Sequence, residues 1–254
     1  MMRARLKISI FIALTMQISC ATSIGIHDSL PQIFVVLGTN RCNTALRATD
    51  LFATPGSDCS WQMIDATGRA IDAPIIRLNS IQSSLYGANL AIPMVSGEIE
   101  FLATGPSGEF SLVAVEAPND QATSVFDPPL AIAPVQISPD QSFDSSTLMR
   151  VDWMDGRGER DRGVGTRTMR IVGTEQVRTP LGEFETIRLE TKFDAVLRFA
   201  KANRTTTLWV APGIGPVAEE WHERITVFGV PISTESGIAL RILPIPSTKS
   251  SLVP

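Results

Sequence analysis

Hydrophobic and polar residues alternate along most of the chain, and this period of two predicts β-strands. The clearest case is the segment 217–228. A strand there would carry Val217, Trp221 and Glu223 on one face and His222 on the other. No segment beyond the first twenty residues keeps a helical period, so we expect little helix in the folded part of the chain.

The same alternation predicts a series of short strands separated by turns that contain glycine or proline. A long hairpin is expected around the turn 179–182, because proline followed two residues later by glycine is typical of a turn. A charged, glycine-rich hairpin tip is expected over 155–165. The other predicted strands are 33–37, 61–64, 75–78, 90–95, 98–103, 110–115 and 238–242. This spacing predicts an all-β, mainly antiparallel fold, either a curved sheet or half-barrel or a sandwich.

One segment interrupts this series and coincides with a change in charge. Residues 128–144 contain four prolines, which predict an extended crossing segment rather than a central strand. Residues 21–145 carry four arginines and thirteen acidic residues, whereas 146–245 carry fourteen basic and thirteen acidic residues. Both one folded body over 33–245 and a subdivision near 128–145 agree with this pattern.

The first nineteen residues have the features of a secretory signal peptide. Arg3, Arg5 and Lys7 precede a short apolar run over residues 8–16, and small residues follow it. A positive start, a short apolar region and a small-residue exit are typical of such peptides. The run is shorter than the ~18 residues expected of a membrane-spanning helix. We therefore expect an exported protein of the cell envelope that faces the periplasm. Separately, residues 246–254 are expected to form a tail after the folded body.

Cys20 follows this peptide and is a candidate for lipidation. Ile18 and Ser19 before it resemble the end of a bacterial lipobox, although Gln17 stands where leucine is usual. Ordinary cleavage after Ala21 is the alternative. Lipidation would anchor the chain in a membrane through Cys20 and a tether over 20–32. Since no aspartate follows the cysteine, the outer membrane is slightly favoured.

Two further cysteines, Cys42 and Cys59, are the candidates for a disulfide. If Cys20 is acylated, they form an even pair in an oxidising compartment. A bridge across such a loop would stabilise the fold by roughly 3 kcal/mol. Two free, buried thiols are the alternative.

Composition and motifs limit the chemistry that the chain can carry. A formal net charge of −4 over 254 residues argues against a nucleic-acid partner, which needs a basic face. His222 and Glu220 would share one strand face and could offer two metal ligands, but a solvated face with local ion pairs explains them as well. No nucleophile elbow occurs. We therefore expect no catalytic residues, metal or cofactor, and an enzyme that uses His222 is the third choice.

Two segments of the C-terminal half carry a family resemblance. They are EQVRTPLGEFET (175–186) and TLWVAPGIGPV (207–217). In both, the chain resembles uncharacterised bacterial envelope lipoproteins and periplasmic proteins related to LolA-like lipoprotein carriers. The resemblance implies a half-barrel in which an antiparallel sheet curls around an apolar cavity. It brings no catalytic residues.

Trp209 and Trp221 are the candidate ligand-cavity residues, because an aromatic ring with a polar nitrogen suits the mouth of a cavity. A plain core position is the alternative for each. The function expected from the sequence is binding or scaffolding in the envelope, with a lipid or acyl chain held in an apolar cavity. The alternative is a structural partner with a packed core that acts through contacts with other envelope proteins.

Overall fold

The computed structural model describes residues 33–52, 58–72 and 75–242. The predictions for the signal peptide, Cys20, the tether and the tail lie outside the described residues. Within these ranges the predicted all-β, mainly antiparallel fold is confirmed. Helical structure there is limited to 3-10 turns at Ala48–Leu51, Leu85–Gly87 and Pro118–Asp120. None of the described segments forms a helix long and apolar enough to cross a bilayer.

Sixteen strands make up the described body. The first ten are β1 Val35–Asn40, β2 Leu46–Arg47, β3 Asp58–Ile64, β4 Ile76–Asn79, β5 Ile81–Gln82, β6 Leu90–Pro93, β7 Ile99–Thr104, β8 Phe110–Ala117, β9 Ala122–Ala133 and β10 Gln136–Ile137. The last six are longer: β11 Ser142–Trp153, β12 Glu159–Thr179, β13 Gly182–Leu197, β14 Ala200–Ala211, β15 Gly215–Val227 and β16 Val230–Arg241. The strands expected from the alternation all appear, with shifted ends.

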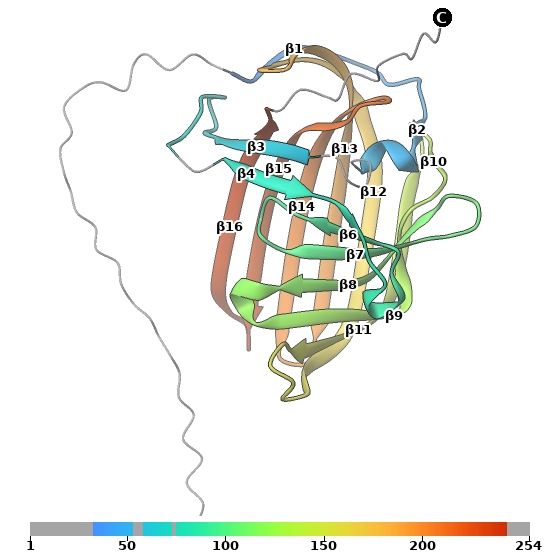
Figure 1. Ribbon diagram of the computed structural model, residues 1–254, viewed down its shortest axis with the longest axis vertical. Helices are drawn as coiled ribbons and strands as arrows, with labels where there is room; N and C mark the ends of the chain where they lie inside the picture. Colours follow the sequence, from blue (N-terminus) through green and yellow to red (C-terminus); the bar gives the residue numbers. More distant parts are fainter. Residues whose placement is uncertain (1–32, 53–57, 73–74, 243–254) are drawn as a thin grey trace, which may run out of the picture. The chain divides into compact units, whose positions relative to one another are not determined.

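One antiparallel sheet contains all of these strands except the small pair β2 and β10. Its order is β4-β3-β16-β15-β14-β13-β12-β11-β9-β8-β7-β6-β5, and β1 pairs with β12 beside this path. The two edge strands, β4 and β5, are consecutive in the chain and only Ser80 separates them. The sheet therefore curls until its edges meet at one short connection. In Figure 1 the strands β6–β8 cross in front of the long strands β13–β15.

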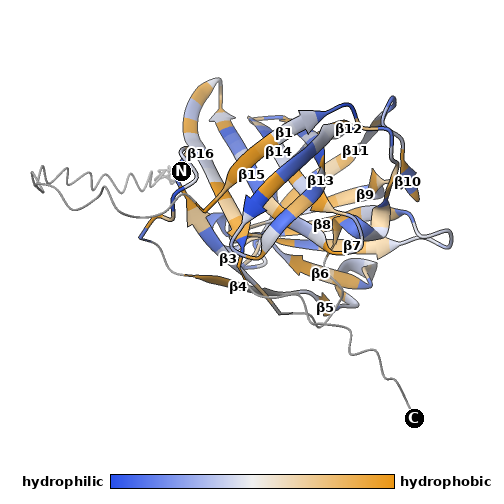
Figure 2. Ribbon diagram, turned by 90° about the horizontal axis from the view of Figure 1, so that it is seen from above, coloured by the Kyte–Doolittle hydropathy of each residue, from blue (hydrophilic) through white to orange (hydrophobic). Residues whose placement is uncertain are grey.

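The hairpins of the long strands follow the sequence pattern closely. Thr179 pairs with Gly182, so β12 and β13 are joined by the two residues Pro180 and Leu181, as the turn signal predicts. The tip between β11 and β12 is shorter than expected, because β12 already begins at Glu159. Residues of opposite hydropathy alternate along these strands in Figure 2, which gives the curled sheet a distinct inner face.

The expectation that prolines exclude a central strand is wrong for 128–133, whereas 134–141, which contains Pro134 and Pro139, does lie outside the large sheet. Pro128 and Pro129 lie within β9, which pairs with β8 on one side and β11 on the other. The β8 ladder skips from Leu130 to Val125, and the β11 ladder ends at Asp127. The prolines thus occupy the one stretch of β9 where no ladder bond is required. The large sheet therefore includes Pro128 and Pro129, and the chain leaves it only between Ala133 and Ser142.

The predicted disulfide is also not formed. Cys42 and Cys59 are both free and buried. Cys42 packs in the large cluster around Leu46, and its Sγ lies 3.1 Å from the carbonyl oxygen of Thr44. Cys59 packs in a different cluster with Trp61 and Trp221. The two thiols are fixed in separate parts of the core, so the structure corresponds to the alternative of two free thiols.

Candidate functional site

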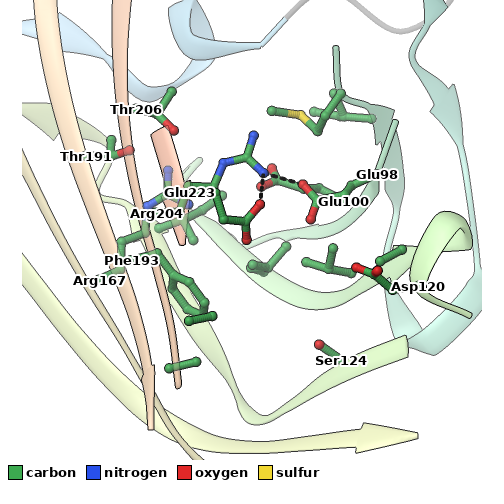
Figure 3. A pocket seen from close by; sticks show the side chains of 18 of the residues that line it. Glu98, Glu100, Asp120, Ser124, Arg167, Thr191, Phe193, Arg204, Thr206 and Glu223 are labelled. Atoms are coloured by element: carbon green, nitrogen blue, oxygen red, sulfur yellow. Dashed lines mark hydrogen bonds and ion pairs between the residues drawn. The ribbon is translucent and has the colours of Figure 1, made fainter. Parts of the chain in front are cut away.

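A cavity of about 500 Å³ lies inside the curled sheet. This volume falls within the ~300–1,000 Å³ that small-molecule pockets usually occupy. Strands from both ends of the sheet line it, including Ile92 of β6, Leu112 of β8, Met149 of β11 and Leu208 of β14. Figure 3 shows the cavity from close by. Most lining side chains are apolar, and the polar ones gather in one place.

The pairing register explains where the polar side chains gather. Arg167 on β12 pairs with Phe193 on β13, Phe193 pairs with Arg204 on β14, and Arg204 pairs with Glu223 on β15. All four line the cavity. We call these four residues the charged row. It crosses the inner face of four neighbouring strands, so its side chains lie side by side at one level of the cavity.

The next row on the same face is small and apolar. It consists of Gly165, Ala195, Ala202 and Ile225, again paired across β12 to β15. We call it the small row. The short side chains of Ala195 and Ala202 leave space in the cavity, whereas the rings of Phe193 and Phe126 cover Gly165. The small row separates the charged row from the end of the cavity formed by the turns that follow β13 and β15.

Exposed apolar side chains surround that end of the cavity. Phe199, Phe228 and Ile232 all line the cavity, and Phe228 and Ile232 are 77% and 59% exposed. The rings of Phe199 and Phe228 are in contact, with centroids 5.4 Å apart. We call these three residues the rim. Because the rim belongs both to the cavity wall and to the surface, the cavity opens to solvent there.

Arg204 is the most highly paired charge in the cavity. It forms an ion pair with Glu98, and its Nη2 lies 3.1 Å from the Ser96 hydroxyl. The carboxylates of Glu219 and Glu223 stand 4.0 and 3.9 Å from its guanidinium. Figure 3 shows Arg204 extending from the wall of long strands toward Glu98. It therefore links two parts of the sheet that lie far apart in the sequence.

The carboxyl groups around Arg204 are not all stabilised as anions. Burial raises the pKa of Glu219 to about 7, and Arg204 offsets only part of this effect. Burial and the nearby Glu98 raise the pKa of Glu223 to about 6. Burial also raises the pKa of Glu100. Arg204 has its pKa raised by these carboxylates, although burial alone would lower it.

Arg167 has no such partners. No hydrogen bond or ion pair within the described ranges involves its guanidinium, and its Nε is buried without a hydrogen-bond partner. Burial lowers its pKa, and only the more distant charge of Glu100 opposes this effect. A buried donor without a partner costs free energy, so its presence in a cavity wall indicates a place for an acceptor on a ligand. Glu219 likewise has one carboxyl oxygen, Oε1, without a hydrogen bond.

Neither tryptophan proposed from the sequence lines the cavity. Trp209 lies next to the lining residue Leu208 and faces the other side of the sheet. There its Nε1 donates to Glu175 Oε2 at 2.7 Å, and its ring packs against Phe34. Trp221 does face inward, but it packs over Gly237 in the cluster of Cys59 and leaves no surface on the cavity. Both correspond to the alternative of a core position.

His222 lies on the face opposite to the cavity. It is exposed, and so is Glu220 two residues before it. The lining residues of β15 are the alternate ones, such as Glu219 and Glu223. Among the residues that the structure describes, no group of three or more His, Cys, Asp and Glu could hold a metal ion.

The sequence contained only part of the signal for the charged row. Alternation over 217–228 already put Glu219 and Glu223 on the same face as Val217 and Trp221, and acidic residues on an apolar face are unusual. Arg167 and Arg204 gave no such signal, because each stands among hydroxyl and charged residues. Glu98 could not be linked to Arg204 without knowing how the sheet curls.

Comparisons with known proteins add little to this description. No protein-family model matches the chain, and no curated protein matches it. The chain is similar in structure to a protein from Bacteroides fragilis described as a candidate exported protein with a YmcC-like fold. The match has a TM-score of 0.37 and 12% sequence identity, over 78% of this chain and 98% of that one. The resemblance to LolA-like lipoprotein carriers therefore stays a prediction.

Proposed function

We propose that this chain is a non-catalytic, exported envelope protein that holds a lipid or acyl chain in its cavity. The observation that carries the proposal is the cavity itself: about 500 Å³ inside a curled sheet, with mainly apolar walls. A sheet whose only task is structural would fill this space with side chains, since protein interiors are normally close-packed. The small row does the opposite at Ala195 and Ala202, because both line the cavity where larger residues would close it.

The rim supports the same proposal. Phe228 and Gly229 form the two-residue turn between β15 and β16, with φ of 50° and 79°. Such turns favour asparagine followed by glycine, because the first residue also needs a positive φ. A phenylalanine that is 77% exposed is unfavourable there for both backbone and solvent. Its presence at the opening of the cavity suits contact with an apolar ligand that enters or leaves.

Export and anchoring belong to the proposal through the N-terminal sequence. The signal peptide and the lipobox-like Cys20 would bring the chain to the envelope and attach it to a membrane, with the outer membrane favoured by Ala21. A protein attached to a membrane would have its proposed ligand, a lipid or acyl chain, in the adjacent bilayer.

The alternative of a structural partner would act through an exposed sheet edge or apolar patch. The edge strands β4 and β5 are only four and two residues long, which offers little edge to a partner. The rim is an exposed apolar patch, and it lies at the cavity opening. Both features favour the ligand-binding proposal.

The test is binding of a neutral apolar dye, N-phenyl-1-naphthylamine, which fluoresces strongly when it leaves water. We expect one dye molecule to bind each protein molecule. Ala202→Trp should abolish binding, because the indole would fill the space above the small row. Thr205→Trp is the matched control, since Thr205 is exposed on the opposite face of β14 and should leave binding intact. Absence of dye binding to the parent protein, or equal binding by both variants, would contradict the proposal.

A further inference from the structure

The unpartnered arginine at the inner end of the cavity identifies the kind of ligand that fits it. The inference rests on the proposed function, because it assumes that an apolar chain enters the cavity. We infer that the ligand is a single-chain amphiphile with an anionic head, and that the head binds Arg167 while the chain lies over the small row toward the rim. The shared chemistry is a carboxylate or phosphate on a long acyl or alkyl chain.

The first step is the position of Arg167. Its side chain faces the cavity from β12, between Ser145 of β11 and Phe193 of β13 in the pairing register. Its Nε has no hydrogen-bond partner in the structure. A guanidinium offers five N–H donors in a planar fork that matches a carboxylate or phosphate. An anionic head would supply the acceptors that the protein does not.

The second step is that the other arginine of the charged row is already occupied. Arg204 is surrounded by Glu98, Glu219 and Glu223, and it also bonds to Ser96. A ligand anion would have to displace these groups to reach it. Arg167 stands two positions away along the same row and has none of them, so the head is directed to Arg167 and not to Arg204.

The third step is the surroundings of the head. Two hydroxyl groups lie one row deeper on the same face: Thr191 pairs with Met169, and Thr206 pairs with Thr191. Both line the cavity, and Figure 3 shows them beside Arg204 and Arg167. Glu100 faces this region from β7, and burial raises its pKa. The two hydroxyl groups can donate hydrogen bonds to an anion.

The charges that face the head come from several strands. They are Arg204 on β14, Glu219 and Glu223 on β15, Arg241 on β16, and Glu98 and Glu100 at β7. Arg241 is also buried, with its Nε unpartnered and its Nη1 3.2 Å from the Ile214 carbonyl oxygen. Protonation of Glu219 and Glu223, whose pKa values are raised to about 7 and about 6, removes negative charge from this part of the cavity and so favours an anion below that pH.

The fourth step is length. Phe199 in the rim follows the end of β13 at Leu197, and the strand from Phe193 in the charged row to Leu197 spans roughly 13 Å at ~3.3 Å per residue. An acyl chain spans about half of a bilayer core of ~30 Å, or roughly 15 Å. A chain of that length therefore reaches from a head at Arg167, past Ala195 and Ala202, to the rim.

The test compares three ligands of equal chain length: hexadecanoate, hexadecyl phosphate and hexadecanol. Their affinities are measured by displacement of bound N-phenyl-1-naphthylamine from the folded chain at pH 5.5, below the raised pKa values of Glu219 and Glu223. At least one of the two anions should bind tenfold or more tightly than the alcohol, as expected for hydrogen bonds to a charged group. Which anion binds better distinguishes a fatty-acid head from a phosphate head.

Arg167→Met is the variant that tests the assigned residue, and Arg170→Met is its matched control. Arg170 lies on the same strand but pairs with Glu190 on the exposed face. Arg167→Met should reduce the preference for the anion to about one while hexadecanol still displaces the dye. Arg170→Met should leave the preference unchanged.

Two results would overturn the inference while leaving the proposed function intact. One is equal affinity of the parent protein for anion and alcohol, a result that needs no variant to fold. The other is an unchanged preference in Arg167→Met. Failure of all three ligands and of the dye to bind would instead contradict the proposed function.

Discussion

Two buried carboxylates on neighbouring parts of one sheet show how a structural site differs from a binding site. Glu175 of β12 is 2% exposed and accepts hydrogen bonds from Trp209 Nε1 at 2.7 Å, Arg188 Nη1 at 2.8 Å and Thr39 Oγ1 at 3.3 Å. Glu219 of β15 is 4% exposed, yet its Oε1 has no hydrogen bond and its nearest cation stands 4.0 Å away. The protein itself supplies hydrogen-bond donors to both carboxylate oxygens of Glu175, but it supplies none to Oε1 of Glu219.

The difference follows from what each carboxylate does for the fold. Glu175 joins three strands: β1 through Thr39, β13 through Arg188 and β14 through Trp209. Its cost of burial is offset because both oxygens are bonded. Glu219 instead faces the cavity, where its Oε1 has no hydrogen-bond partner. Burial there raises its pKa to about 7. Incomplete satisfaction of buried charges is typical of functional sites, which keep groups free for a ligand.

The largest expected effect comes from removing the carboxylate of Glu175. Glu175→Ala leaves Arg188 and Trp209 without their acceptor and should lower the free energy of unfolding by about 3 kcal/mol. Denaturant unfolding followed by tryptophan fluorescence measures this. The matched control is Glu183→Ala, which removes an exposed pair with Arg178 and should cost less than ~1 kcal/mol. Equal losses in the two variants would show that Glu175 is not a structural centre.

The next prediction tests the difference between Glu175 and Glu219 through the pH dependence of stability. The pKa of Glu219 is raised from 4.5 to about 7 in the folded state, so ionisation is disfavoured by folding. The stability that its neutral form contributes is complete below about pH 4.5 and is lost as the pH rises toward 7. Glu219→Gln should therefore raise the free energy of unfolding by about 1–3 kcal/mol at pH 8 and change it little at pH 4.5.

The measurement is a pair of denaturant titrations at the two pH values on the parent protein and the variant. The parent should be less stable at pH 8 than at pH 4.5, and the variant should lose most of that difference. Glu223, with a pKa raised to about 6, contributes the remainder. Destabilisation of Glu219→Gln at pH 8 would mean that the carboxylate supports the fold as Glu175 does, and the comparison would fail.

The smallest effect concerns the rim. Phe228→Asn replaces an exposed ring at φ 50° with a residue that tolerates this conformation and should raise stability by about 0.5 kcal/mol. Because the ring also borders the opening, dye binding should slow in stopped-flow fluorescence. A loss of stability on this substitution would indicate that Phe228 serves the fold rather than the cavity.

The fold was largely predictable from sequence because its signal is local. Period-two alternation and turn residues such as Pro180 and Gly182 act within a few residues of each other. The prolines of β9 misled the prediction because the sequence does not reveal which ladder bonds are absent, and the structure places Pro128 and Pro129 where none is needed. The predicted disulfide between Cys42 and Cys59 was wrong for a similar reason. An even cysteine count does not show whether two thiols lie in the same part of the core.

The site was poorly predictable because it depends on register and curling. Trp209 and Trp221 are the tryptophans that the sequence suggested as cavity residues. Trp209 faces the opposite side of the sheet, and Trp221 is buried by packing in the cluster of Cys59. Arg167 is inconspicuous in sequence and becomes important only when pairing places it beside Phe193 and Arg204. A cavity forms where side chains are small, and the sequence does not mark Ala195 as facing an interior.

The central claim is that the cavity holds an apolar ligand, and native mass spectrometry of the protein tests it most directly. The chain is purified from the envelope without organic solvent and weighed before and after solvent extraction, beside Ala202→Trp prepared in the same way. The account predicts an added mass of one lipid or fatty-acid molecule on the parent protein, removed by extraction and absent from the variant. The bare protein mass in every sample, or an equal added mass on the cavity-filled variant, would contradict it.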